Sequence, residues 1–270
     1  MAQTERRRVL AFSNDRRFAL SALLAHVSVL QIVLVVIVTA VSAVLGGIAG
    51  YGTGPLMPLV LVPMVGAAPV VPIIAISSLF TNGARLSAFR EVLNIRLAII
   101  AFTAALPTCL LGAYLYTLLS SRGAAIVIGT TLMATVPLRR ILRNRGHHLG
   151  EKSFIVGAAG WGLLVGGTSG AGVVLISLLL AAGLEGSAVI ATDSAISIVT
   201  GVVKIGVFAF AGVLTPTVIV IALLMGLVGF PCTFIAKSLV QRMPVHVHTA
   251  ILDAIVIVGG AIMIYGALSQ

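Results

Sequence analysis

Residues 18–84 contain no Asp, Glu, Lys or Arg and read FALSALLAHVSVLQIVLVVIVTAVSAVLGGIAGYGTGPLMPLVLVPMVGAAPVVPIIAISSLFTNGA. A helix that crosses the hydrocarbon core of a bilayer needs roughly 20 apolar residues, so this window alone holds about three spans. The apolar run at residues 18–45 is longer than the roughly 7–15 residues of a signal-peptide core, and a signal peptide is therefore a poor interpretation of it.

The rest of the chain has the same character. Residues 97–121 and 205–236 also lack charged side chains, and the whole chain is 59% hydrophobic and only 9% charged. An average soluble domain is about 25% charged. The sequence therefore predicts an all-α, polytopic transmembrane helical bundle without a sizeable soluble domain.

Ten apolar segments are expected, separated by glycine, proline and polar residues. The second segment of each half is too short to span about 30 Å of hydrocarbon at 1.5 Å per residue, which predicts two half-length helices or broken, re-entrant pairs. We divide the chain into a basic tail (1–27), a first repeat (28–141), a basic loop (142–152) and a second repeat (153–270). The expected segments are 27–48, 54–66, 69–89, 94–119, 122–141, 153–168, 171–183, 186–211, 214–238 and 248–268.

The two halves share a series of motifs in the same order. Gly46-Gly47-Ile48-Ala49-Gly50 matches Gly166-Gly167-Thr168-Ser169-Gly170, and the next long segment carries Ala75-Ile76-Ser77-Ser78 in one half and Thr192-Asp193-Ser194-Ala195 in the other. With an odd number of segments per half, the two copies have opposite orientations. The sequence thus predicts inverted repeats, an architecture that many secondary transporters use.

The chain carries a formal charge of +10, and its basic residues flank apolar runs. Basic residues with this distribution lie in the loops beside membrane spans and set the topology of the protein. They do not form the single basic patch that is typical of a nucleic-acid-binding protein. If loops 90–96, 139–152 and 238–247 are cytoplasmic, ten spans place both termini outside. The arginines before Phe18 conflict with that orientation, and an additional membrane element within residues 8–26 would resolve the conflict.

The two glycine-rich breaks, 50–55 and 166–172, each join a long apolar run to a short one. Irregular backbone at membrane depth is tolerated where protein or a water-filled cavity satisfies its polar groups. Glycine allows a ligand to approach the backbone, and a helix N-terminus beside such a turn attracts anions. The alternative interpretation is close helix packing by small residues.

Three ionisable residues lie within the third predicted segments of the two halves, 69–89 and 186–211. Asp193 and Lys204 lie in segment 186–211, and Arg85 lies toward the end of its counterpart. An unpaired charge in hydrocarbon is costly, so these side chains should face the protein interior, with Lys204 near a substrate anion and Asp193 as a proton-linked or polar lining group. The alternative is that Lys204 and Arg85 extend to the membrane interface. Asp253 is expected to be an interfacial cap.

Small polar residues recur on the third segment of each half. They can donate hydrogen bonds to a substrate, bond back to their own helix, or join helices to one another. These polar residues are Ser77, Ser78, Thr81, Asn82, Ser194, Ser197 and Thr200.

The two cysteines, Cys109 and Cys232, lie in apolar runs without metal-ligand spacing and are expected to be buried thiols.

One motif of the second break also fits an enzyme. Gly167-Thr168-Ser169-Gly170 fits the Gly-x-Ser-Gly of rhomboid-type intramembrane serine proteases, which require a histidine base within hydrogen-bond reach of the serine. His246 and His248 begin the last segment, but no small-residue pattern follows them to bring that helix close. The other repeat carries Ala49 where Ser169 stands, so duplication explains the motif without catalysis.

Taken together, these motifs resemble those of the TauE/SafE family of sulfite and sulfonate exporters. Family members carry Gly-x-Gly-Gly-Gly-x-Leu after the first helix, here Gly50 to Leu56 with Thr53 replacing the central glycine. A helix similar to Ala-x-x-x-Ser-Leu follows, here Ala75 to Leu79, and then a basic loop. The second half repeats the pattern as Ser169-Gly170-Ala171-Gly172, Ala191-Thr192 and Lys204, so the resemblance covers residues 28–268.

The resemblance implies a non-enzymatic secondary transporter, an exporter of sulfite, sulfonates or small organic acids across the inner membrane. A permease for an unrelated small solute is the other transporter hypothesis. We expect a small anionic substrate, the lipid bilayer as surroundings, proton or sodium as a candidate coupling ion, a homodimer as one candidate assembly, and no cofactor or metal. The residues expected to bind the substrate are Gly50, Gly52, Thr53, Gly54, Ser77, Ser78, Asn82, Arg85, Thr168, Ser169, Gly170, Gly172, Asp193, Ser194 and Lys204.

Overall fold

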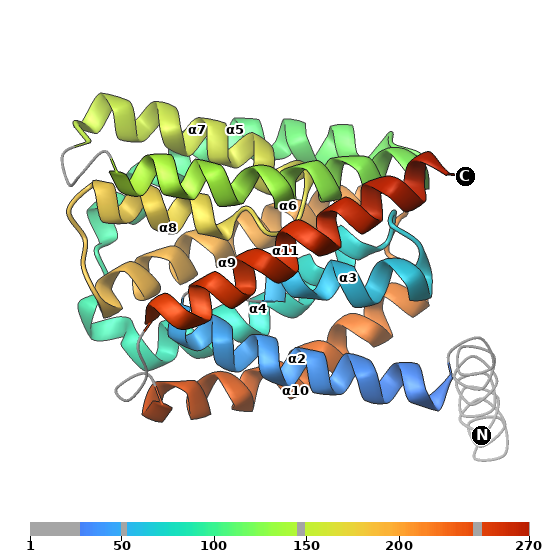
Figure 1. Cartoon of the computed structure of the whole chain (residues 1–270). Coiled ribbons are helices and arrows are strands. Elements are labelled where there is room, and N and C mark those ends of the chain that lie inside the picture. The colour runs from blue at the N-terminus through green and yellow to red at the C-terminus, as the bar shows by residue number, and fades with distance from the viewer. Residues whose placement is uncertain (1–27, 50–52, 145–148, 240–244, 270) are drawn as a thin grey trace, which may run out of the picture.

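The computed structural model describes residues 28–49, 53–144, 149–239 and 245–269, and within these ranges it contains helices and no strand (Figure 1). All ten expected segments are confirmed as helices, with ends within three residues of the expected ones. The helices are α2 (Val29–Ala49), α3 (Thr53–Val65), α4 (Val70–Phe89), α5 (Ile95–Thr117), α6 (Ser121–Asn144), α7 (Glu151–Gly167), α8 (Gly172–Ala181), α9 (Ser187–Phe210), α10 (Pro216–Leu239) and α11 (Val245–Leu268), with a 3₁₀ turn at Arg90–Val92.

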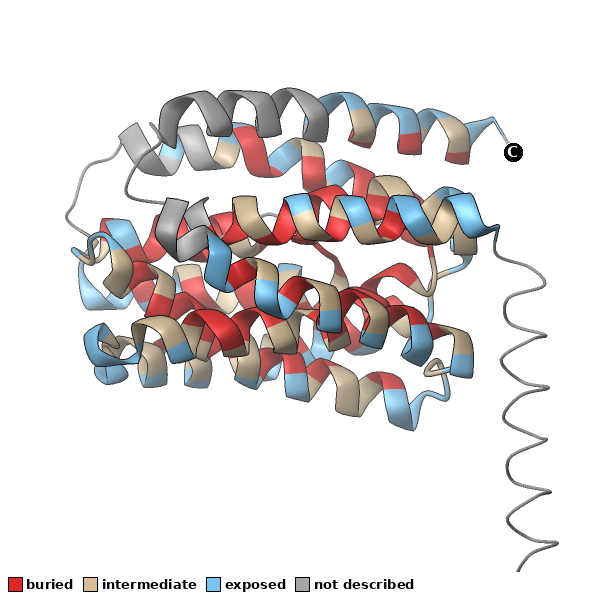
Figure 2. Ribbon diagram, turned by 90° about the horizontal axis from the view of Figure 1, so that it is seen from below, coloured by how far each residue is buried: buried red, intermediate tan, exposed pale blue. Residues whose placement is uncertain are grey.

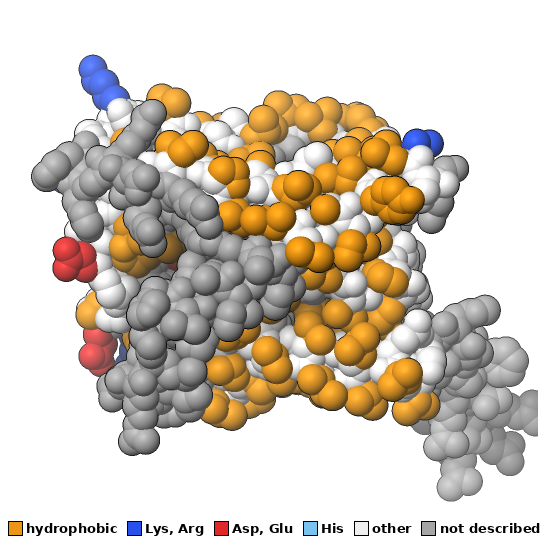
Figure 3. All heavy atoms as spheres, in the orientation of Figure 1, with side chains coloured by type: hydrophobic (Ala, Val, Ile, Leu, Met, Phe, Trp, Pro, Cys, Tyr) orange, Lys and Arg blue, Asp and Glu red, His pale blue; other side chains and the backbone are white. Residues whose placement is uncertain are grey.

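Six of the described helices, α2, α4, α5, α6, α9 and α10, are long and apolar enough to cross a bilayer. Hydrophobic side chains cover the flank of the molecule between its two ends (Figure 3). Large apolar side chains that would be buried in a water-soluble protein are exposed, such as Phe210 at 97% and Tyr265 at 77%. The chain is a multi-pass membrane protein, and lipid rather than water contacts this flank.

The two half-length helices that the sequence predicts are present. α3 has 13 residues and α8 has 10, so at 1.5 Å per residue they extend roughly 20 Å and 15 Å and fall short of the hydrocarbon thickness. The end of α3 lies beside the α5–α6 turn, because Tyr116 Oη donates to Ala67 O at 2.8 Å. The end of α8 lies at the opposite end, where Leu149 N donates to Ala181 O at 2.9 Å and Arg96 pairs with Glu151 at 2.9 Å.

The helix contacts occur in pairs that exchange the two halves of the chain. α2 packs on α10 as α7 packs on α5, α4 packs on α10 as α9 packs on α5, and α3 contacts α11 as α8 contacts α6. The third helices of the two halves, α4 and α9, pack on each other, and about half of the residues of each are buried. Figure 2 shows that buried residues gather in the interior of the bundle. Such pairing is what two copies of a five-helix unit would produce. The inverted relation of the copies and their boundaries stay predictions.

The packing of α7 on α5 depends on glycine. A Cβ atom added to Gly162 or Gly166 would collide with backbone atoms of Ala105 or Cys109, and one added to Gly112 would collide with Leu163 O. Small residues four apart let two helix backbones approach closely. The packing interpretation of the glycine-rich sequence therefore holds for Gly166, which belongs to this helix interface.

Candidate functional site

The two glycine-rich breaks meet inside the bundle. A Cβ atom on Gly54 would lie 3.0 Å from the backbone nitrogen of Gly170, and one on Gly170 would lie 3.6 Å from the Cα of Pro55. Gly170 has a φ angle of +90°, which L side chains rarely adopt, so glycine is required there for conformation as well as for space. Gly50 and Gly52, which complete the first break in the sequence, lie outside the described residues.

A cavity of about 100 Å³ lies at this meeting point. Its lining comes from the start of α3, the middle of α4, the end of α7, the second break and the middle of α9. The lining residues are Thr53, Gly54, Pro55, Ile74, Ala75, Ser78, Asn82, Arg85, Trp161, Val165, Thr168, Ser169, Gly170, Ala171, Gly172, Asp193, Ser197, Thr200, Gly201 and Lys204.

Arg85 connects the two halves of the chain at this cavity. It projects from α4, is only 6% exposed, and donates from Nη2 to Asn82 Oδ1 at 2.7 Å. Its Nη1 lies 3.9 Å from Asp193 Oδ2 on α9. A buried cation thus lies beside a buried carboxylate from the other half, and each lowers the cost of burying the other.

Lys204 reaches the second break from α9. Its side chain is buried, and Nζ donates to the carbonyl oxygen of Thr168 at 3.4 Å. An ammonium group has three donors, so this long bond leaves it able to bind further acceptors. The interfacial alternative does not hold for Arg85 or Lys204, because both side chains are buried within the protein and line the cavity.

Two buried side-chain atoms lack a hydrogen-bond partner among the described residues, Ser169 Oγ and Asp193 Oδ1. Both residues line the cavity. Buried polar atoms are rarely left unpaired, because each one loses its hydration without compensation. The two atoms therefore mark the cavity as a place where a polar ligand or water completes the hydrogen bonding.

The starts of both half-length helices face the cavity, since Thr53, Gly54 and Pro55 open α3 and Gly172 opens α8. The first N–H groups of a helix have no partner within it, and they carry the positive end of its dipole. A Cβ atom on Gly172 would contact no described atom within 4 Å, so this glycine is not needed for packing among the described helices. The ligand-approach interpretation thus fits Gly172, whereas Gly166 serves packing.

Eleven of the fifteen predicted site residues line the cavity. Ser77 and Ser194 do not line it, and their hydroxyls donate to Ile74 O and Ile190 O of their own helices at 3.2 and 2.7 Å. Ser78 and Thr200 also bond to their own helices, at 2.9 Å, but still contribute to the lining. Gly50 and Gly52 are the two predicted site residues outside the described part of the chain.

Trp161 is the main lining residue that sequence reasoning missed. It is fully buried in α7, and its indole nitrogen donates to Ala171 O at 3.0 Å, which fixes the second break just before α8. It is the only tryptophan in the chain, and it stands a few residues before the break. A buried indole N–H needs a hydrogen-bond acceptor, and the glycine-rich break that follows offers backbone carbonyl groups. This combination could have identified Trp161 as a residue of the site.

Several other predictions fall on undescribed parts of the chain. The histidines considered as bases for Ser169 and the proposed cap Asp253 lie where the structure does not describe side chains. The additional N-terminal element within residues 8–26 also lies outside the described residues. Within the described lining of the cavity there is no histidine.

The model of the family described as sulfite exporter TauE/SafE matches residues 32–263, most of the chain. The chain belongs to the TauE/SafE family. Searches among curated proteins and among solved structures gave no match. The family assignment confirms the resemblance drawn from the duplicated motifs, and it identifies the chain as a membrane transporter of the sulfite-exporter type.

Proposed function

We propose that this TauE/SafE protein is a secondary transporter that exports a small anion, such as sulfite, a sulfonate or a small organic acid, across the inner membrane. The observation that carries the proposal is the cavity in which Arg85 and Lys204 are buried where the two breaks meet. The family assignment supports the transport of an anion, and the site residues support the class of substrate.

The charges of the lining favour an anion. The ionisable side chains with formal charge are Arg85 and Lys204, both positive, and Asp193, negative, which leaves one net positive charge when all three are ionised. Charged groups at membrane depth are costly unless they are paired or hydrated. A bound anion would balance the remaining charge, and it would accept hydrogen bonds from the lysine and from the unpartnered Ser169 hydroxyl.

The size of the cavity favours a compact substrate. A volume of about 100 Å³ is roughly that of three water molecules. This suits an oxyanion of a few heavy atoms, such as sulfite, and the charged head of a sulfonate or carboxylate. A larger solute would require the bundle to open.

The placement of the cavity suits alternating access. It lies between the starts of α3 and α8, which extend from it toward opposite ends of the molecule. Rocking one repeat against the other would expose the same anion site first to one side and then to the other. Asp193, the acidic residue of the lining, is the group we assign to coupling with a proton or sodium ion.

Transport by reconstituted vesicles tests the proposal. Purified protein in liposomes should carry sulfite, and sulfoacetate, taurine and acetate would define the substrate range. Lys204→Gln and Arg85→Gln should each lower the initial rate roughly tenfold or more, because each removes a charge-assisted hydrogen bond.

Lys152→Gln and Arg90→Gln are matched controls, since both residues are exposed and lie outside the cavity lining. They should transport at the parent rate. Transport of neutral solutes in preference to every anion tested, unchanged by Lys204→Gln, would contradict the proposal and favour a permease for an unrelated solute.

A further inference from the structure

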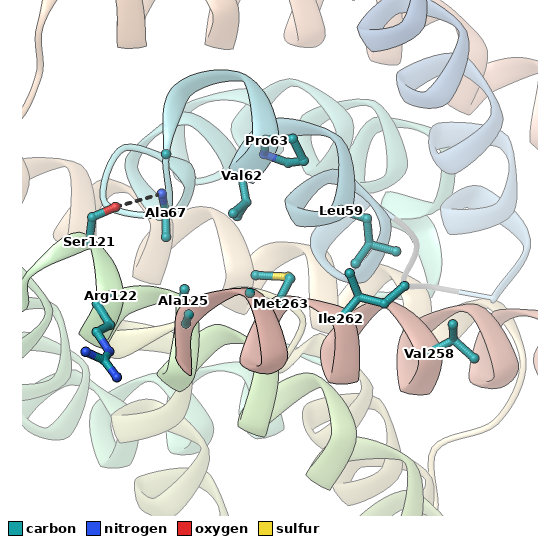
Figure 4. A pocket seen from close by; sticks show the side chains of 14 residues that line it. Leu59, Val62, Pro63, Ala67, Ser121, Arg122, Ala125, Val258, Ile262 and Met263 are labelled. Carbon is teal, nitrogen blue, oxygen red and sulfur yellow. Dashed lines mark hydrogen bonds between the residues drawn. The ribbon is translucent and has the colours of Figure 1, made fainter. Parts of the chain in front are cut away.

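A second, larger hollow lies away from the anion cavity, between α3, the start of α6 and the second half of α11. It has a volume of about 800 Å³ and is lined by Leu59, Val62, Pro63, Gly66, Ala67, Ser121, Arg122, Ala125, Val258, Gly259, Ile262, Met263, Gly266 and Ala267. The lining is apolar along α3 and α11, and its polar members, Ser121 and Arg122, lie together at one end (Figure 4). We call this hollow the α3–α11 groove.

The groove is open because small residues border it. Gly66, Ala67, Ala125, Gly266 and Ala267 surround the end that contains Arg122. A Cβ atom on Gly266 would meet no atom of the described residues within 4 Å, so none of them fills the space beside it. Apolar surface of this kind on a bilayer-embedded flank needs an apolar occupant.

The dimensions of the groove match one leaflet. Val258 and Ala267 mark its extent along α11, and the nine steps between them at 1.5 Å each span roughly 14 Å. Half of a hydrocarbon core of about 30 Å is about 15 Å. The groove therefore has the length of an acyl chain that reaches from the headgroup level to the bilayer midplane.

Arg122 lies at headgroup level. It is the second residue of α6, directly after the α5–α6 turn, and its side chain is exposed. The described residues include no ion-pair partner for it. Glu151 lies at the far end, where α5 begins and α8 ends, and Asp193 lies in the anion cavity. Among the described residues, no carboxylate therefore balances the positive charge of Arg122 at the mouth of this apolar groove.

We propose that the α3–α11 groove binds one anionic phospholipid. An acyl chain lies along Ile262 and Met263, and the phosphate accepts hydrogen bonds from the Arg122 guanidinium. The Ser121 hydroxyl, which accepts from Ala67 N at 3.3 Å, keeps its own proton to donate to the same phosphate. Such a lipid would support α3, the half-length helix whose start borders the anion cavity.

Native mass spectrometry of the full chain, released from detergent containing equal phosphatidylglycerol and phosphatidylethanolamine, tests the proposal. The parent should retain one phosphatidylglycerol. Arg122→Gln should reduce its retention roughly fivefold, the effect of one basic residue on an anionic lipid. Arg122→Lys should retain most of it, and Gly266→Leu, which places a side chain in the groove, should abolish binding of both lipids.

Two matched controls should behave like the parent. Arg90→Gln removes an exposed arginine at the opposite end of the molecule, and Gly160→Leu adds a side chain at an exposed α7 glycine with nothing within 4 Å of its Cβ position. Equal retention of phosphatidylglycerol in the parent, Arg122→Gln and Gly266→Leu would overturn the proposal. A dimer that Gly266→Leu converts to monomer, without a change in bound lipid, would overturn it in favour of a second copy as the occupant.

Discussion

At the scale of single residues, the ion pair between Arg85 and Asp193 is the feature on which the site depends most. The two side chains come from equivalent helices of the two halves and lie 3.9 Å apart, both buried. Their charges were visible in the sequence as ionisable residues inside apolar runs. Their pairing was not, because helical spacing relates residues within one helix and does not say which helix packs against it.

A double-mutant cycle measures this pair. Arg85→Gln alone should lower the free energy of unfolding by about 3 kcal/mol, because it leaves a buried carboxylate without its counter-charge. Asp193→Asn should have a similar effect, and the double variant should cost less than the sum of the two. The thermal unfolding midpoints of the purified variants give the comparison.

The exposed pair Arg96–Glu151 provides the control cycle. Its atoms lie 2.9 Å apart, but its side chains are 77% and 56% exposed. Exposed ion pairs contribute about 0–1 kcal/mol, so Arg96→Gln and Glu151→Gln should have small effects that add. Strict additivity in the buried cycle as well would show that Arg85 and Asp193 do not stabilise each other.

At the scale of elements, the half-length helices and the breaks before them could be predicted from the sequence. Glycine and proline mark the ends of the apolar runs, and run length separates half-length from full-length helices. Which glycines serve helix packing and which border the cavity could not be predicted, because these roles depend on tertiary contacts. Gly166 packs against the backbone of α5, whereas Gly172 borders the cavity with open space beside it.

Two alanine substitutions separate these roles. Gly166→Ala should destabilise the protein strongly, because its Cβ would collide with the backbone of Cys109. Gly172→Ala should keep or raise stability, since alanine favours a helix over glycine by about 1 kcal/mol, but it should slow anion transport because its methyl group enters the cavity. Thermal unfolding and vesicle transport on both variants distinguish the effects, and transport at the parent rate by Gly172→Ala would argue against this break as part of the site.

At the scale of the whole molecule, membrane sidedness follows from the basic loops. Arg96 and the start of α7 lie at one end, and the α5–α6 turn lies at the other. The positive-inside rule predicts that the basic end lies in the cytoplasm. The sequence already indicated this orientation. The groove beside Arg122 was not foreseeable, because an empty volume between three helices leaves no pattern in any one of them.

Thiol labelling of intact cells tests the sidedness. Ser120 and Glu91 lie at opposite ends of the molecule and are both exposed, so cysteines placed at these two positions should be reactive. With a membrane-impermeant maleimide, Ser120→Cys should react in intact cells, whereas Glu91→Cys should react only after lysis. The parent, with Cys109 buried and Cys232 half-buried, gives the background. Labelling of Glu91→Cys alone in intact cells would reverse the assigned orientation.

The central claim, that a small anion binds between the two breaks beside Lys204, is tested most directly by titrating the purified protein with sulfite and following its thermal stabilisation. Lys204→Gln should weaken binding by about 1–3 kcal/mol, the worth of a charge-assisted hydrogen bond. Lys204→Arg should be intermediate, because the charge remains while its geometry changes, and Lys152→Gln should match the parent. Equal sulfite-induced shifts in the parent and Lys204→Gln would contradict the proposed site.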